Sequence, residues 1–277
     1  MKKFRFGLIG NNVTYSKSAD IFKALFEQHQ IDGSCEVFNI KPDEFSQKFQ
    51  AITDSAVDGL SVTIPYKKEV IAHLDEVAPV ANAIEAVNSI RLIDGKRFGY
   101  NTDCFGFSYP LREYSEKLKH SKAIIFGAGG AAKAILYALF TDYEIKDFTV
   151  VARDMNKLQQ FKDSIVADID RLEIKLQSFE NIELSERYAI CVNCTPLGGW
   201  NMPDVMPFPS KCDMSNIKIY YDLNYNADNK CMNYAQSKTH HTINGSAMLV
   251  AQALRSFYLW TGIKTEFEPI YKRVFGA

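Results

Sequence analysis

The chain has 277 residues and carries 32 Lys and Arg against 33 Asp and Glu, so its formal net charge is -1. Proteins that bind nucleic acid or anionic membranes carry a basic excess, and this balance argues against both kinds of partner. Apolar residues make up 47% of the chain and charged residues 23%, a composition that supports a buried core and excludes a disordered chain.

The N-terminal stretch and the cysteines predict a cytoplasmic protein. Arg5 and two glycines interrupt the first apolar stretch, so it lacks the continuous apolar core of a secretory signal. The six cysteines are scattered, and in a chain of this length without an export signal they are most simply reduced thiols. The longest apolar window, 123–140, contains Lys133 and a glycine-rich turn, which indicates a strand, a turn and a buried helix instead of a membrane span.

The first hundred residues alternate between strand-like and helix-like stretches. The apolar patterns predict strands over 4–10, 35–40 and 59–64, helices over 18–30, from Pro42 and from Pro65 to about 73, and a hairpin of 89–93 with 97–100. The hairpin follows from Asp94-Gly95, a strong turn signal between two strand-like runs. This half of the chain is therefore predicted to be α/β.

From Lys122 onward, strands and helices alternate more regularly. Strands are expected over 123–126, 148–152, about 174–176, 188–192 and 217–222, with helices from about Gly130, from about Met155 and over 246–260. Such alternation implies parallel strands joined by right-handed crossovers. The pattern predicts a doubly wound, Rossmann-type sheet.

A glycine-rich turn follows the first strand of this second half. Gly127 permits a tight turn, Gly129 lets the backbone approach a pyrophosphate, and the small Ala132 allows the helix to pack closely on the strand. The start of the helix then presents free N–H groups to phosphates. The turn therefore predicts a dinucleotide-binding site.

Two cationic residues stand at the end of the next strand. Arg153 and Lys157 can neutralise a 2′-phosphate dianion, which favours NADP over NAD. Asp154 has two interpretations: it caps the helix from Met155, or it accepts the ribose hydroxyls and raises the affinity for NAD.

Cys191 and Cys194 form a C-x-x-C pair. A zinc site needs a second such pair or a suitably spaced histidine pair, and the sequence has neither, so no metal is expected. The pair lies in an apolar run typical of the end of a buried strand, whereas a reactive thiol is activated at the start of a helix. We expect both thiols to be packed in the core.

Short polar side chains follow the strands and turns of the first half. They are Ser16, Ser18, Thr63, Lys67, Asn88 and Asn101-Thr102-Asp103. Each alone is explained by a helix cap, a turn or a solvated helix face. Together they predict a ligand cleft, because ligands of α/β sheets bind where the strands end.

The motifs resemble the shikimate dehydrogenase family, and they occur in the family's order. They are Tyr15-Ser16-Lys17-Ser18, 59–67, Ala86-Val87-Asn88-Ser89, Asn101-Thr102-Asp103, 127–132, 193–198, 221–225 and 248–253. The resemblance implies two α/β domains: a substrate domain of residues 1–102 completed by C-terminal helices in 246–277, and a Rossmann-type NADP domain of residues 103–245. It implies reversible, NADP-dependent interconversion of shikimate and 3-dehydroshikimate on the route to chorismate and the aromatic amino acids.

The resemblance also implies roles for single residues. Lys67 and Asp103 are the expected catalytic pair. The expected substrate ligands are Ser16, Ser18, Thr63, Lys67, Asn88, Asp103, Tyr225 and Gln252. The expected cofactor ligands are Gly127, Gly129, Gly130, Ala131, Arg153, Lys157, Thr195, Leu197 and Gly245.

The chain departs from the family pattern at several positions. Ala19 stands where the family commonly has Pro, Ser61 where it has Asn, Glu85 where it has Gly, Ala152 where it has Asn, and Asn226-Ala227 where a Pro is usual. Ala152 lacks an amide that could touch the adenosine ribose, so the choice between NADP and NAD stays open. The choice between monomer and homodimer stays open as well.

Three other functions share parts of this pattern. A quinate/shikimate dehydrogenase using NAD or both cofactors stays open. A non-catalytic sensor of the same fold is expected to lack Lys67 or Asp103, and both are present. A methylenetetrahydrofolate dehydrogenase of similar architecture leaves the paired serines and the Asn-Thr-Asp motif unexplained.

Overall fold

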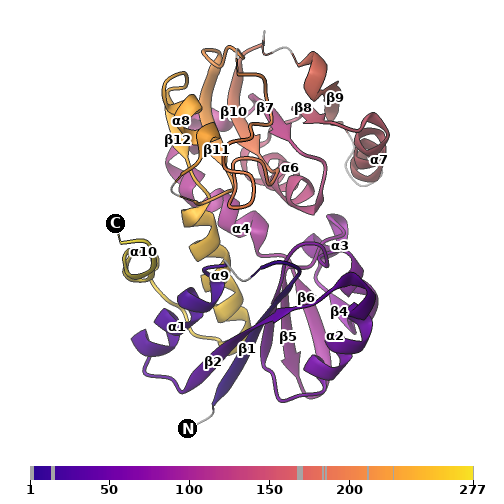
Figure 1. The fold of residues 1–277 in the computed structure, drawn as a ribbon, viewed down its shortest axis with the longest axis vertical. Helices are drawn as coiled ribbons and strands as arrows, with labels where there is room; N and C mark the ends of the chain where they lie inside the picture. Colours follow the sequence, from indigo (N-terminus) through magenta and orange to yellow (C-terminus); the bar gives the residue numbers. More distant parts are fainter. Residues whose placement is uncertain are drawn as a thin grey trace. The chain divides into compact units, whose positions relative to one another are not determined.

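The computed structural model describes residues 3–13, 16–166, 171–182, 184, 186–210, 212–226 and 228–276 (Figure 1). Tyr15 and Ala227, named above, lie outside the described residues. The chain divides into two compact units, one of Met1–Gly106 with Leu249–Ala277 and one of Phe107–Met248. Asp103 lies in the first of these units. The predicted domain boundaries, after residues 102 and 245, lie within four residues of these divisions.

The first unit holds a mixed sheet in the order β2-β1-β3-β5-β6-β4. Its strands are β1 Phe4–Gly10, β2 Gly33–Asn39, β3 Gly59–Val62, β4 Glu76–Val77, β5 Ser89–Ile93 and β6 Lys96–Tyr100. β1 runs parallel to β2 and β3, and β5 runs antiparallel to β3 and β6. The predicted hairpin is confirmed: Asp94 and Gly95 both have positive φ, as a two-residue turn of this kind requires.

The helices of the first unit surround this sheet. They are α1 Ser18–Gln28, η1 Pro42–Glu44, α2 Phe45–Thr53, η2 Glu69–His73, α3 Pro79–Ala83, α10 Phe267–Phe275, and most of α4 Asp103–Ser108 and α9 Ser246–Thr261. The helix expected from Pro65 to about 73 is wrong in its start and kind. Residues 65–68 form turns, and η2 is a 3₁₀ helix, with bonds such as Ile71 N to Lys68 O at 3.2 Å.

Apolar cores lie on both faces of this sheet, because successive side chains of a strand point to opposite faces. Phe6 of β1 packs with α1, α9 and α10, and its ring centroid lies 4.7 Å from that of Trp260. Ile9, on the other face, packs with Phe45 of α2. The C-terminal helices therefore complete the core of the N-terminal half, which is why α9 and α10 lie beside β1 and α1 in Figure 1.

The second unit holds an all-parallel sheet in the order β12-β11-β10-β7-β8-β9. Its strands are β7 Lys122–Phe126, β8 Asp147–Ala152, β9 Glu173–Ser178, β10 Tyr188–Asn193, β11 Ile217–Asp222 and β12 His241–Ile243. This is the order of a doubly wound dinucleotide-binding sheet, and the Rossmann-type prediction is confirmed. The order reverses between β7 and β10, where ligands of such sheets bind.

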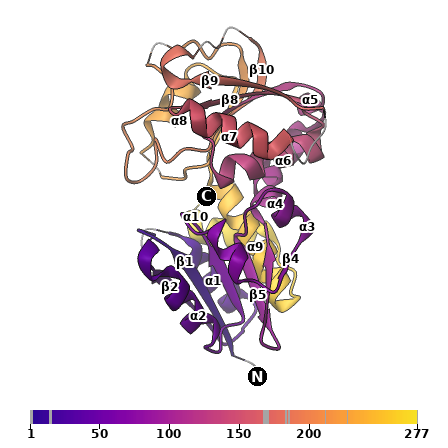
Figure 2. The same cartoon turned by 90° about the vertical axis from the view of Figure 1, so that its right-hand side faces the viewer.

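The helices of the second unit are η3 Tyr109–Tyr114, α5 Ser115–Leu118, α6 Gly130–Tyr143, α7 Met155–Val166, η4 Phe179–Asn181 and α8 Lys230–Gln236. The apolar window 123–140 folds as most of β7, the glycine turn and most of α6, as predicted. Figure 2 shows α7 running along β8 and β9. Among the described residues, no helix combines the length and apolarity needed to cross a bilayer.

Candidate active site

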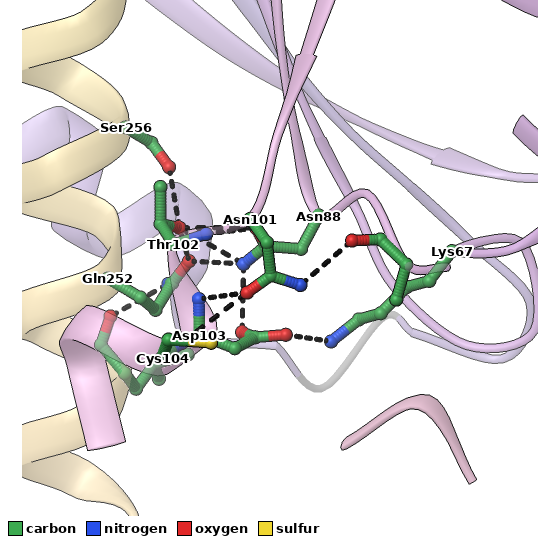
Figure 3. A network of polar contacts seen from close by, with 10 residues as sticks. Lys67, Asn88, Asn101, Thr102, Asp103, Cys104, Gln252 and Ser256 are labelled. Atoms are coloured by element: carbon green, nitrogen blue, oxygen red, sulfur yellow. Dashed lines mark hydrogen bonds and ion pairs between the residues drawn. The ribbon is translucent and has the colours of Figure 1, made fainter. Parts of the chain in front are cut away.

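Lys67 and Asp103 form an ion pair in the first unit (Figure 3). Lys67 Nζ lies 2.6 Å from Asp103 Oδ2, and the two side chains are only 19% and 8% exposed. An ion pair shielded from water in this way is stronger than one on an open surface. The backbone of Lys67 is fixed as well, because its carbonyl accepts a hydrogen bond of 2.8 Å from Val87 N.

Asn88 holds the second oxygen of the Asp103 carboxylate. Its Nδ2 donates to Asp103 Oδ1 at 2.8 Å and to Thr102 Oγ1 at 3.0 Å, and its Oδ1 accepts from Thr102 N at 2.7 Å. The backbone N–H of Thr102 can only donate, so the orientation of the Asn88 amide is unambiguous. Asn88 is buried, and the orientation of the Asp103 carboxylate is therefore fixed from both sides.

The C-terminal helix α9 contributes two further polar groups. Gln252 Oε1 lies 3.4 Å from Thr102 Oγ1 and 3.5 Å from Asn88 Nδ2, and Ser256 Oγ lies 3.2 Å from Thr102 Oγ1 (Figure 3). Gln252 and Ser256 share one face of the helix because they are four residues apart. Gln252 is one of the predicted substrate ligands, whereas Ser256 was not predicted, although it lies one turn further along the same helix face.

Asn101 sets the first turn of α4, on which Asp103 lies. Its Oδ1 accepts from Asp103 N at 3.0 Å and from Cys104 N at 3.4 Å, and its Nδ2 donates to Ala86 O at 2.9 Å. An Asn that accepts from the backbone two and three residues ahead is a common way to start a helix. Asn101 therefore positions Asp103 and ties it to the segment that carries Asn88.

The remaining predicted substrate residues of the first unit lie at the ends of β1 and β3. Ser16 Oγ donates to Ser18 Oγ at 3.0 Å, and Ser18 is the first residue of α1. Thr63 lies against Gly10 at the end of β1, since its Cγ2 would be 2.6 Å from a Cβ placed there. Among the described residues, no hydrogen bond links these three to the Lys67–Asp103 pair. Tyr225 belongs to the second unit, whereas the other expected substrate ligands belong to the first.

The glycine turn of the second unit lies at the reversal point between β7 and β10. Gly127 has φ +110°, and a Cβ on it would lie 3.3 Å from Thr195 Cγ2, so the turn passes close to the loop after β10. Gly129 is exposed with open space where a Cβ would be, and no described side chain caps the start of α6 at Gly130. Free N–H groups and an open backbone approach fit the pyrophosphate of a dinucleotide.

The end of β8 offers two cations, and the carboxylate between them caps a helix. Asp154 Oδ1 accepts from Asn156 N at 2.9 Å and from Lys157 N at 3.2 Å, so Asp154 caps α7, the first of its two interpretations. Arg153 and Lys157 are exposed. This donor set fits a 2′-phosphate, and therefore NADP.

The loop after β10 and the turn before α9 contain the last predicted cofactor residues. Thr195 Oγ1 donates to Asn193 Oδ1 at 2.7 Å, and Leu197 O accepts from Asn193 Nδ2 at 2.9 Å. A Cβ on Gly245 would overlap the backbone oxygen of Leu223, so this position demands glycine. The second unit thus places Gly127 beside Thr195, with Asn193 fixing the loop that follows.

The two cysteines of the C-x-x-C pair lie in an environment that suppresses thiol reactivity. Cys191 is fully buried in β10, and burial raises the pKa of both its thiol and that of Cys194 well above the ordinary value. All six cysteines are free. Among the described residues, no group of three His, Cys, Asp or Glu side chains could hold a metal ion.

A doubly wound unit with a glycine turn, joined in one chain to a unit with a buried Lys–Asp pair, is typical of a two-domain dehydrogenase that uses a dinucleotide. The model of the shikimate dehydrogenase substrate binding domain matches residues 8–90, and that of the shikimate 5′-dehydrogenase C-terminal domain matches residues 245–275. The shikimate dehydrogenase (NADP(+)) of Clostridium botulinum is 33% identical over 261 residues, 93% of this chain and 97% of the relative. The chain belongs to the shikimate dehydrogenase family.

Solved structures agree with this assignment. Shikimate dehydrogenase 1 from Peptoclostridium difficile is 29% identical, with a TM-score of 0.84 over 98% of this chain and 97% of the other. The shikimate 5-dehydrogenase of Thermus thermophilus, solved in complex with NADP(H) and shikimate, is 26% identical, with a TM-score of 0.83 over 98% of each chain. The two-domain fold of the family is therefore the fold of this chain.

Proposed function

We propose that this protein is an NADP-dependent shikimate dehydrogenase that interconverts shikimate and 3-dehydroshikimate in the biosynthesis of chorismate and the aromatic amino acids. The observation that carries the proposal is the shielded Lys67–Asp103 pair, whose carboxylate is held by Asn88. A lysine beside a fixed carboxylate is suited to move one proton to and from an alcohol oxygen.

NADP(H), when bound, supplies the hydride acceptor or donor. During reduction, the Lys67 ammonium donates a hydrogen bond to the ketone oxygen and gives it a proton; during oxidation, the neutral amine takes the proton of the alcohol. Asp103 orients Lys67 through the 2.6 Å contact, and Asn88 and Asn101 keep Asp103 in place. These residues therefore handle the proton while the cofactor handles the hydride.

The remaining substrate contacts follow from the polar groups at the strand ends. Ser16 and Ser18 bind the carboxylate of shikimate, and Thr63, Asn88 and Gln252 bind its ring hydroxyls. Tyr225 is a further substrate ligand. The support is that Ser16 and Ser18 already share a hydrogen bond at the start of α1 and that Asn88 and Gln252 belong to one buried network. A site of this kind rejects analogues that lack a hydroxyl, because buried polar groups are then left unpaired.

The first unit is the substrate domain, and the second unit is the NADP domain. Gly127, Gly129, Gly130 and Ala131 hold the pyrophosphate, Arg153 and Lys157 hold the 2′-phosphate, and Thr195, Leu197 and Gly245 lie along the nicotinamide half. The uncapped start of α6 and the capping role of Asp154 support this arrangement. A cytoplasmic location is supported by the six free cysteines.

The test is a matrix of initial rates with shikimate or quinate against NADP⁺ or NAD⁺, followed by the absorbance of the reduced nicotinamide. Shikimate with NADP⁺ is expected to give the highest kcat/KM. A higher kcat/KM for quinate would instead make the protein a quinate/shikimate dehydrogenase, and a higher kcat/KM with NAD⁺ would overturn the assignment of NADP. Binding of shikimate without turnover in any combination would make it a sensor.

A further inference from the structure

β11 ends in a buried carboxylate that has no cationic partner among the described residues. Asp222 is fully buried and pairs in register with Asn193 of the neighbouring strand β10. Its Oδ2 accepts from Tyr220 Oη at 3.0 Å, Asn193 Nδ2 at 3.1 Å and Asn229 Nδ2 at 3.3 Å, and its Oδ1 accepts from Asn224 N at 2.9 Å and Asn224 Nδ2 at 2.8 Å. Five donors thus converge on one side chain.

The orientation of each amide in this group is fixed by a backbone partner. Asn193 Oδ1 accepts from Thr195 N at 3.0 Å, and Asn229 Oδ1 accepts from Met232 N at 3.1 Å, so both turn their NH₂ groups toward the carboxylate. Asn224 Nδ2 donates to backbone carbonyls, which cannot donate. Asp222 therefore acts as an acceptor toward every amide, which is the role of an ionised carboxylate. Burial raises its pKa, and these hydrogen bonds oppose that shift.

The side-chain amides of Asn193 and Asn224 also hold the loop that follows β10 by hydrogen bonds. Asn193 Nδ2 donates to Leu197 O at 2.9 Å, while Asn224 Nδ2 donates to Thr195 O at 3.1 Å and to Leu197 O at 3.2 Å. Each of these NH₂ groups is shared between Asp222 and the loop. The carboxylate thus fixes the direction in which both amides point, and the amides fix the backbone of residues 195–197.

Gly198, the next residue of the loop, packs against the asparagines around Asp222. Gly198 has φ +84°, and a Cβ on it would lie 2.8 Å from Asn229 Oδ1. Asn226 Nδ2 donates to Gly198 O at 2.9 Å. The other side of the loop faces the glycine turn, since Thr195 Cγ2 lies 3.3 Å from a Cβ position on Gly127. The loop is held between the buried amides and the point where the sheet order reverses.

We propose that Asp222 is a positioning residue for the dinucleotide: its buried carboxylate orients Asn193 and Asn224 so that the loop 195–198 is preformed at the cofactor site. The inference rests on the proposed function, which places Thr195 and Leu197 beside the nicotinamide. Asp222 acts through the two amides and does not touch the cofactor itself. The role requires a carboxylate at position 222, which accepts hydrogen bonds at both oxygens. An asparagine there would turn its own NH₂ group toward the N–H donors of the neighbouring residues.

The experiment compares the wild type with Asp222→Asn and uses two measurements. In the cofactor-free protein, hydrogen exchange of peptides covering residues 195–198 is expected to be faster in the variant than in the wild type. Exchange of the two central strands, β7 and β10, is expected to stay unchanged. Calorimetry is expected to show NADP⁺ binding weakened roughly tenfold or more, because buried donors lose their acceptor. The dissociation constant of shikimate in the absence of cofactor is expected to stay within about twofold, a change worth less than half a kilocalorie per mole.

Asp213→Asn is the matched control, since Asp213 is an exposed acceptor in a turn of the same unit and receives Ser215 N at 2.9 Å. It is expected to behave as the wild type in both measurements. If Asp222→Asn fails to fold, Asn224→Ala replaces it, because this variant removes one of the two amides that link the loop to the carboxylate and leaves Asp222 its other donors. The same pattern is expected.

Unchanged exchange of the loop in a folded variant overturns the proposal, and so does faster exchange spread over the whole sheet, which marks a merely structural role. Unchanged affinity for NADP⁺ overturns it as well. Failure of the proposed function is a separate result: the wild type then shows no turnover of shikimate with NADP⁺, while loop exchange and dinucleotide binding still report on Asp222.

Discussion

The ammonium of Lys67 lies 2.6 Å from the carboxylate of Asp103, although 36 residues separate them in the chain. An ammonium has three N–H donors, and among the described residues Asp103 is its hydrogen-bond acceptor. The other Asp103 oxygen is taken by Asn88. Asp103 therefore takes one of the three donors of Lys67, and the other two are available to a ligand or to water.

Replacing Lys67 by Ala is expected to lower kcat by about 10²- to 10⁴-fold, the usual contribution of a general acid–base group. The fold is expected to persist, because Asn88 still donates to Asp103. Steady-state kinetics and circular dichroism check both statements. Lys68→Ala is the control, since Lys68 is exposed and pairs only with Glu85 among the described residues. Turnover near the wild-type value in Lys67→Ala would refute the assigned role.

Replacing Arg153 by Ala is expected to raise the KM for NADPH about tenfold, the effect of losing one charge-assisted hydrogen bond. The KM for shikimate and the KM for NADH are expected to change little, because neither molecule carries the 2′-phosphate. Arg187→Ala, at an exposed arginine of the same unit, serves as the control. Equal increases for NADPH and NADH would contradict a phosphate contact.

Glu85 stands where the family commonly has glycine and adopts φ +51°, a left-handed conformation that costs a side-chain-bearing residue about 1 kcal/mol. Both Glu85→Gly and Glu85→Ala lose the exposed ion pair with Lys68. Only the glycine variant relieves the backbone, so its free energy of unfolding is expected to exceed that of the alanine variant by about 1 kcal/mol. Urea denaturation measures the difference, and equal stabilities would rule out strain at this residue.

Burial raises the pKa of the Cys231 thiol to about 12. At pH 8 the folded protein therefore holds almost no thiolate there, and iodoacetamide is expected to label Cys231 far more slowly than in urea. As the pH rises above 9, the unfolded chain releases this proton while the folded chain keeps it. The free energy of unfolding then falls by about 1.4 kcal/mol per pH unit for this thiol until the folded pKa is reached. Mass spectrometry of labelled peptides checks the first statement, and rapid labelling of the native protein would contradict it.

The sequence predicted the elements that are long and regular. Five of the six parallel strands of the second unit were expected, because each apolar run is followed by a helix or a turn. β4 and β12 were missed because two or three residues show no periodicity. The start of η2 was misplaced because the chain just before it is held at the end of β1 by long-range bonds that the local sequence does not show, from Thr63 N to Ile9 O and from Asn11 N to Ile64 O.

Only candidate site residues that lie within a family motif could be predicted from the sequence. Lys67 and Asp103 were identified from the family's motifs, and their contact depends on how α4 packs beside the turn after β3. The sequence alone could not reveal the proposed role of Asp222, because its amide donors come from β10 and from the loop after β11. Their meeting is set by the register that pairs Asn193 with Asp222, which only the folded sheet defines.

The position of Trp260 has a consequence for synthesis on the ribosome. Its indole occupies the space that a Cβ on Gly59 would need and stacks on Phe22, so the N-terminal sheet lacks one of its largest packing partners until α9 has been translated. The intervening Rossmann unit is continuous in the chain and emerges earlier as a whole. Vectorial synthesis therefore delivers a finished Rossmann unit before the sheet of the first unit can close its core.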